Sequence, residues 1–145
     1  MNPKESIQDK FTNYIMLQWK KSLAIELMDR TFEEIKNRWQ KDPKSIFNKA
    51  MENVMPKIEV RPKRVWWSIF QVPQEVTAKR QLFLASKWII KAARGKKWGS
   101  FVKFLANELI DAANESWDAI KKKLDVYKMA EANKAFARFA TKRSK

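Results

Sequence analysis

The stretch KIEVRPKRVWWSIFQVPQEV at residues 57–76 separates two helical parts of the chain. Polar and apolar residues alternate with period two over residues 57–61 and again over residues 70–72, which is typical of β-strands. Pro62 and Pro73 lack the N–H group that a central strand needs, so we expect both arms to be edge strands. The stretch therefore predicts a projecting β-hairpin arm over residues 57–76, with its tip near Val65, Trp66, Trp67 and Ser68.

Helical periodicity fills the chain before this arm. Apolar residues recur at the three- and four-residue spacing of a helix face over residues 6–17, 22–37 and 43–54. Asp42 and Pro43 suit the N-cap and the first position of the third of these helices, and Pro56 ends it. We therefore expect three helices before the hairpin.

The same periodicity returns after the arm. It covers residues 78–94, 99–113 and about 118–140, and residues 141–145 form a polar, basic tail. A chain of 145 residues without an internal repeat suits one domain, spanning residues 1–145. The predicted fold is mainly α: a six-helix bundle with a protruding β-hairpin arm.

Positive charge dominates the composition. The chain carries 31 Lys and Arg against 16 Asp and Glu, a formal net charge of +15. Such an excess attracts polyanions, of which phosphate backbones are the commonest, so it indicates a nucleic-acid-binding protein. No stretch approaches the roughly 20 apolar residues that cross a bilayer, and we expect a soluble, cytoplasmic protein with no membrane partner.

The residues that most often carry catalysis do not occur in the sequence. The chain has no histidine and no cysteine, which removes the commonest general base and the thiolate ligands of zinc. It also lacks the glycine-rich loop that cradles nucleotide phosphates. Glu33, Glu34 and Asp111 lie on or beside lysine-rich helical faces, where carboxylates ordinarily pair with solvated lysines. We therefore predict no enzyme activity, no metal, no cofactor and no small-molecule substrate.

Basic residues gather in four places: the start of the second helix, the hairpin, the helix at 78–94 with the residues after it, and the last helix. A lone lysine run is usually a solvated helix face, but a basic hairpin beside a basic helix is more specific. Arms bearing Arg and Lys grip RNA loops while a helix lies against the phosphate backbone. The predicted RNA-binding residues are Lys20, Lys21, Lys57, Arg61, Lys63, Arg64, Arg80, Lys87, Lys91, Arg94, Lys96, Lys97, Lys121, Lys122 and Lys123.

Three other interpretations of the charge stay open from the residues alone. A helical DNA-binding regulator would need base-reading polar side chains on a recognition helix, and residues 78–94 have few Asn or Gln. A cationic membrane-surface protein would concentrate its charge on one amphipathic helix rather than along the chain. The plainest alternative is a basic surface that only keeps the protein soluble.

Several longer segments carry a resemblance to a known family. They include LANELIDAAN at residues 105–114, MAEANKAFA at residues 129–137, and shorter matches within residues 42–54, 59–65, 71–73 and 88–94. Together they resemble the bacterial-type small-subunit ribosomal protein seven family, over about residues 9–139. The resemblance implies the fold expected above, with six helices and a hairpin arm.

The resemblance also implies a role in the ribosome. Members of this family bind the 3′ major domain of 16S rRNA directly and nucleate assembly of the small-subunit head. Their hairpin lies at the subunit interface near the exit-site tRNA, and their neighbours are small-subunit ribosomal proteins nine and eleven. The residues that match RNA-facing positions of the family are Lys20, Lys21, Arg61, Lys63, Arg64, Arg80 and Arg94, with the run Lys121, Lys122 and Lys123.

Tryptophan and glycine have unusual counts, with 7 Trp against 2 Gly. The family has glycine where this chain has Trp19, Trp39, Trp66, Trp67, Trp98 and Trp117, whereas Trp88 matches a family tryptophan. One explanation is that the tryptophans are genuine and pack on helix ends or stack on bases. The other is that UGA codons, which some bacteria read as glycine, are shown as tryptophan. Helix ends and hairpin tips often need a left-handed backbone, which suits glycine and favours the second explanation.

Overall fold

The computed structural model describes residues 6–116 and 118–140, so Trp117 and the predicted basic tail at 141–145 lie outside the described residues. Within that part, six α-helices and one antiparallel hairpin confirm the mainly α fold with a β-hairpin arm. The elements are α1 (Ile7–Ile15), α2 (Lys21–Trp39), α3 (Pro43–Val54), β1 (Ile58–Val65), β2 (Ser68–Glu75), α4 (Ala78–Gly95), α5 (Phe101–Ala113), α6 (Asp118–Ala132) and a short 3₁₀ helix, η1 (Lys134–Phe139). That the whole chain is a single domain stays a prediction.

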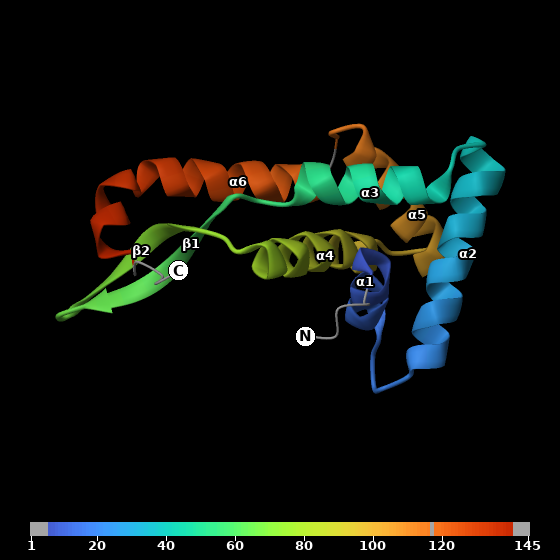
Figure 1. Cartoon of the computed structure of the whole chain (residues 1–145), viewed down its shortest axis with the longest axis horizontal. Coiled ribbons are helices and arrows are strands. Elements are labelled where there is room, and N and C mark those ends of the chain that lie inside the picture. Colours follow the sequence, from blue (N-terminus) through green and yellow to red (C-terminus); the bar gives the residue numbers. More distant parts are fainter. Residues whose placement is uncertain (1–5, 117, 141–145) are drawn as a thin grey trace.

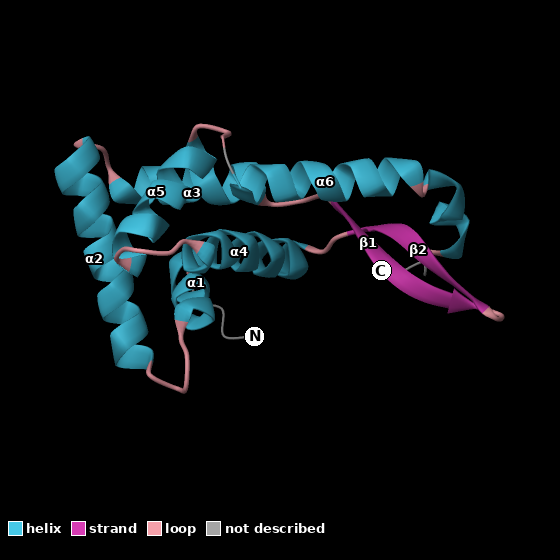
Figure 2. Ribbon diagram, turned by 180° about the vertical axis from the view of Figure 1, so that it is seen from behind, coloured by secondary structure: helices cyan, strands magenta, loops and turns pink. Residues whose placement is uncertain are grey.

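The molecule is elongated, with helices at one end and the hairpin at the other (Figure 1). Helices α1, α2 and α5 lie at the helical end, and α2 runs across the direction of α3, α4 and α6. Helix α6 extends from this end to the hairpin, where the chain folds back as η1 (Figures 1 and 2). The hairpin therefore projects beyond the helical body but is held along one side by the C-terminal elements, α6 and η1.

Helix α5 forms the centre of the core, because it contacts α2, α3, α4 and α6. Its Leu105 and Leu109 are fully buried, as are Ile35 of α2, Phe47 of α3 and Ile89 of α4. Each fully buried side chain of this size stabilises the fold by roughly 1.5–3 kcal/mol relative to an exposed one. The packed core therefore holds the helices, and the side chains on their outer faces, in fixed positions. No helix in the described ranges is long and apolar enough to cross a membrane.

The starts of two helices are fixed by local hydrogen bonds. The Asp42 carboxylate accepts the Ser45 backbone N–H at 3.1 Å and Pro43 takes the first position of α3, which confirms the predicted cap. At α1, the Ser6 hydroxyl oxygen accepts the Asp9 N–H at 3.1 Å while the Asp9 carboxylate accepts the Ser6 N–H at 3.0 Å. This reciprocal capping box satisfies two N–H groups that the helix itself leaves unpaired.

The last predicted helix, 118–140, is interrupted, so the expectation of one continuous segment is wrong. Helix α6 ends at Ala132, and η1 begins at Lys134. Between them, the Asn133 side-chain amide donates to the Met129 carbonyl at 2.7 Å, a local bond of the kind that competes with helix continuation. The break turns η1 back toward the hairpin, where Phe136 and Phe139 both pack on Phe70 of β2.

The hairpin matches its sequence prediction closely. Its register runs from Ile58 opposite Glu75 to Val65 opposite Ser68, which leaves Trp66 and Trp67 as a two-residue turn at the tip. The sheet has only these two strands, so both are edge strands. The two prolines therefore do not interrupt the hydrogen bonding of a central strand. Of the two turn residues, only Trp66 has a positive φ, at 58°.

Candidate nucleic-acid interface

Most of the predicted RNA-binding residues are exposed in the structure. Those exposed to solvent are Lys20, Lys21, Lys57, Arg61, Arg64, Lys87, Lys91, Arg94, Lys97, Lys121 and Lys122. Partly buried are Lys63, Arg80, Lys96 and Lys123. The exposed set draws on the start of α2, the hairpin, α4 with its following loop, and α6, so these four elements supply the candidate interface.

Helix α4 presents a basic side opposite its apolar one. Leu82 and Ile89 of this helix are buried in the core, whereas Lys87, Lys91 and Arg94 are exposed. Helical spacing puts the three basic residues on one face. A straight helix with a cationic stripe can lie along a phosphate backbone, because its charges repeat at fixed intervals along the axis.

A buried carboxylate joins the hairpin to α4. The Glu59 side chain is only 9% exposed, and it pairs with Arg61 Nε at 2.8 Å and with Arg80 Nε at 3.2 Å. Arg61 belongs to β1 and Arg80 to the first turn of α4, while the Arg80 guanidinium also lies 5.0 Å from the centre of the Phe83 ring. Since each ion pair uses the Nε atom, the remaining N–H groups of both guanidinium groups can bind other acceptors.

Two cations lie at the N-terminus of α2, where positive charge is least favourable. Lys20 is the N-cap and Lys21 the first helical residue, no side chain caps this end, and the first turn has no acidic residue. The helix dipole adds partial positive charge here, so both lysines oppose local stability and favour an anion nearby. A purely structural helix start would place Asp, Ser or Thr at these positions.

Four of the predicted residues are engaged in contacts that hold the fold. Lys63 Nζ donates to the Phe139 carbonyl at 2.6 Å, and Lys123 Nζ donates to the Asn53 carbonyl at 2.6 Å. Arg94 donates to the Ile15 carbonyl at 2.7 Å, and Lys96 forms an ion pair with the buried Glu108. Sequence patterns did not reveal these contacts, because each acceptor lies far away along the chain, apart from Glu108.

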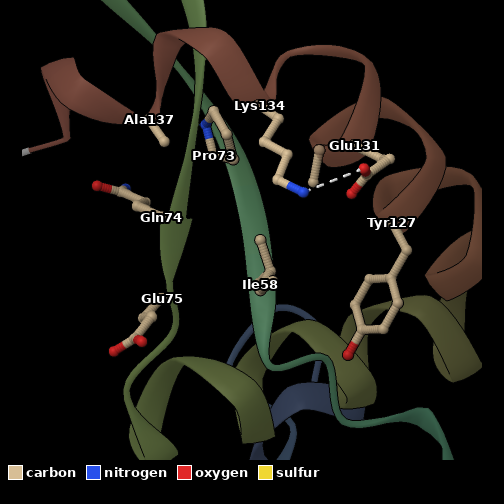
Figure 3. A pocket seen from close by; sticks show the side chains of 9 residues that line it. Ile58, Pro73, Gln74, Glu75, Tyr127, Glu131, Lys134 and Ala137 are labelled. Atoms are coloured by element: carbon tan, nitrogen blue, oxygen red, sulfur yellow. Dashed lines mark hydrogen bonds and ion pairs between the residues drawn. The ribbon is translucent and has the colours of Figure 1, made fainter.

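A cavity of about 350 Å³ lies between the base of the hairpin and the C-terminal elements α6 and η1 (Figure 3). Its lining is mainly apolar, and Lys134 Nζ and Glu131 Oε1 lie 3.4 Å apart at one side. Beside it, the Tyr127 hydroxyl accepts the Lys57 backbone N–H at 2.9 Å, which ties α6 to the start of β1. None of the fifteen predicted RNA-binding residues lines this cavity, so it is separate from the basic interface.

The described residues contain no group of three or more acidic, histidine or cysteine side chains that could hold a metal ion. Of the carboxylates considered above, Asp111 has its pKa raised by burial, an effect that nearby Lys96 opposes. It lies on the buried central helix α5, away from the hairpin, and its raised pKa follows from the lost hydration of its charged form.

A helical body that displays lysine and arginine on a helix face, a helix start and a projecting hairpin has the arrangement of an RNA-binding protein. The family described as Ribosomal protein S7p/S5e matches residues 2–134, and the chain belongs to this family. It is therefore a ribosomal protein of the small subunit, a cytoplasmic particle in bacteria, and RNA binding is general to the family.

Individual relatives agree with this membership. The chain is 48% identical over 130 residues to a "Small ribosomal subunit protein uS7" of Metamycoplasma arthritidis, covering 90% of this chain and 83% of that protein. Proteins of the same name from Mycoplasmopsis agalactiae and Moorella thermoacetica are 46% and 47% identical over the same shares of the two chains.

Proposed function

We propose that this protein binds the 3′ major domain of 16S rRNA directly and nucleates assembly of the small-subunit head. In this proposal the basic hairpin and the basic face of α4 hold the RNA, with the lysines at the start of α2. The role is structural rather than catalytic. The family supports rRNA as the partner, and the basic surface supports the residues assigned to it.

The observation that carries the proposal is the Glu59 cluster. Two guanidinium groups from a hairpin and a helix would repel each other, and the buried carboxylate between them offsets that repulsion. The cluster thereby holds the positive hairpin and the positive helix next to each other. Such a fixed arrangement lowers the ordering cost when both meet a phosphate backbone.

The hairpin can present charge on both sides. Arg61 and Arg64 are three residues apart on β1, and side chains of a strand alternate between its faces. Arg64 is exposed and has no ion-pair partner among the described residues, while Arg61 is anchored by Glu59. A finger with arginine on two faces suits insertion between RNA segments, where each guanidinium can take a phosphate in a forked contact.

Charge reversal on the hairpin tests this assignment. Arg61→Glu together with Arg64→Glu should lower affinity for a 16S 3′ major domain fragment at least tenfold, without loss of helical circular dichroism. A matched control, Lys44→Glu with Lys49→Glu, makes the same charge change on exposed positions of α3, outside the proposed interface. Equal binding by the hairpin variant and the unaltered protein would remove these arginines from the site.

The same binding assay separates the proposal from a DNA-binding regulator. At equal salt, we expect the structured RNA fragment to bind much more tightly than duplex DNA of similar length, because the hairpin and helix fit a folded RNA rather than a regular groove. Equal affinity for the two nucleic acids would mean that only non-specific charge attraction operates.

We further propose that the hairpin tip at residues 65–68 approaches the exit-site tRNA at the subunit interface, and that small-subunit ribosomal proteins nine and eleven are neighbours. The resemblance to the family supports these partners. The distance of the tip from the helical body supports its reaching a second molecule (Figure 2). A photo-crosslinker at position 68 in assembled subunits should label exit-site tRNA, and labelling of rRNA alone would contradict the tRNA contact.

A further inference from the structure

Three tryptophans adopt a backbone conformation that favours glycine. The φ angles are 62° at Trp19, 58° at Trp66 and 67° at Trp98. In this left-handed region the Cβ atom of an L-residue crowds a backbone oxygen, so bulky side chains are genuine outliers there. Glycine has no Cβ atom and adopts the same conformation without strain.

Contacts of the indole rings do not offset this strain. Trp19 is 91% exposed, Trp66 is 84% exposed and Trp98 is 99% exposed. A strained residue persists in a fold when its surroundings hold it in place, and these three side chains extend into solvent. Within the described ranges none of the three rings packs on another aromatic ring or a cation.

Trp88 shows what a tryptophan adapted to this fold looks like. It lies inside the right-handed helix α4 and packs against the hydrophobic core.

Trp39 differs both from Trp88 and from the three left-handed tryptophans, because it is the last residue of α2 and the left-handed position falls on the next residue, Gln40, with φ of 49°. Trp39 therefore does not have the left-handed backbone suggested for helix ends, because α2 ends two residues beyond the helix predicted over residues 22–37.

The two glycines of the chain sharpen the contrast. Proteins ordinarily contain about 7% glycine, much of it at left-handed positions. Here neither Gly95 nor Gly99 has a positive φ, so the left-handed positions of the described residues all hold other residue types. Half of those six positions hold tryptophan, which is one of the largest side chains. The backbone thus has positions whose φ angles favour glycine, and the sequence has tryptophan at three of them.

We infer that the native polypeptide carries glycine at positions 19, 66 and 98, encoded by UGA codons that its ribosomes read as glycine. One codon reading explains both the scarcity of glycine and the strained, exposed tryptophans. The same reading gives glycine at Trp67, which is 89% exposed in the hairpin turn, and leaves Trp88 encoded by UGG. A glycine pair at 66 and 67 would give the hairpin a narrow tip without indole rings.

Peptide mass spectrometry of the protein purified from its source organism tests this inference directly. Peptides spanning positions 19 and 98 should each be lighter by one tryptophan-to-glycine mass difference, and the peptide spanning positions 66 and 67 should be lighter by two. The peptide spanning Trp88 should have the mass calculated with tryptophan at that position. The gene should carry UGA at the three positions and UGG at position 88. A tryptophan in any of the three native peptides, or a UGG codon there, would overturn the inference.

A stability comparison tests the backbone argument independently of the gene. Starting from a recombinant chain with the printed sequence, Trp19→Gly, Trp66→Gly and Trp98→Gly should each raise Tm, by about 2 °C per substitution. Trp88→Gly is the matched control, and it should lower Tm because it leaves a core gap and puts glycine inside a helix. A fall in Tm for all three test variants would contradict the claim that these positions are built for glycine.

Discussion

Glu59 shows how one side chain can serve both folding and binding. Its carboxylate is nearly buried and pairs with both Arg61 and Arg80, so its removal would leave two guanidinium groups facing each other. Breaking a buried, hydrogen-bonded charge group generally costs more than breaking an exposed ion pair. The residue therefore couples the position of the hairpin to the stability of the fold.

We expect Glu59→Gln to lower the free energy of unfolding by about 1–2 kcal/mol, because both arginines lose a charged partner. Urea denaturation followed by circular dichroism measures this change. The control is Glu131→Gln, which removes an ion pair whose side chains are both 76% exposed and should change stability by less than about 0.5 kcal/mol. Equal midpoints for the two variants would show that the Glu59 cluster contributes no more than a surface pair.

The three neighbouring lysines at positions 121–123 have different expected roles, two in RNA binding and one in stabilising the fold. Lys121 and Lys122 are exposed, whereas Lys123 Nζ donates to the Asn53 carbonyl at the end of α3. We expect Lys121→Ala with Lys122→Ala to weaken RNA binding and leave Tm unchanged. Lys123→Ala should instead lower the free energy of unfolding by about 1 kcal/mol. Binding and thermal unfolding assays on both variants decide this, and reversed effects would contradict the assignment.

At the scale of the element, the capping box gives α1 a dependence on pH. Hydrogen bonds from the Ser6 side chain, and then from its backbone N–H, lower the pKa of Asp9 below its ordinary value of 3.8. Because folding favours the carboxylate, its contribution to stability is complete above that value and is lost as the pH falls through the lower folded-state pKa.

We therefore expect Asp9→Asn to reduce Tm at neutral pH, and the difference from the unaltered protein to shrink below about pH 4. Thermal unfolding of both proteins between pH 2.5 and 7, in steps of about half a pH unit, would measure this difference in Tm. Asp29→Asn removes the same charge from an exposed position of α2 that is not part of a cap. A difference from the unaltered protein that stays constant across this pH range would contradict a role for the ionised carboxylate.

The break between α6 and η1 also belongs to this scale. Apolar spacing continues through the break, so the sequence pattern alone predicts one long helix. In the structure the break coincides with the local bond from Asn133 to Met129 and with the packing of Phe136 and Phe139 on Phe70, more than sixty residues earlier in the chain. Helix periodicity contains no information about such a distant partner, which is why the sequence prediction fails at this point.

At the scale of the whole molecule, the net charge of +15 should govern how RNA binding responds to salt. Each phosphate that the protein neutralises releases a counterion, so the logarithm of the binding constant should fall linearly with the logarithm of salt concentration. Several contacts would give a loss of about a thousandfold between 50 and 200 mM salt. Fluorescence anisotropy with the RNA fragment measures this slope, and a nearly flat dependence would exclude phosphate contacts as the main source of affinity.

Local sequence patterns predict the order of the helices and the hairpin, the cap at Asp42 and Pro43, and a hairpin tip near residues 65–68. These features depend on periodicity, proline geometry and hydrogen bonds between near neighbours, all of which act over a few residues.

Long-range packing decides which basic side chains also bond to the fold, whether they are partly buried, like Lys63 and Lys123, or exposed, like Arg94. Lys63, Arg94 and Lys123 donate to carbonyl groups 76, 79 and 70 residues away in the chain. A lysine or arginine in a basic run has the same local pattern whether it points to solvent or to a distant carbonyl. Only the packed fold brings donor and acceptor together, and it thereby shows which residues of the predicted interface also hold the body.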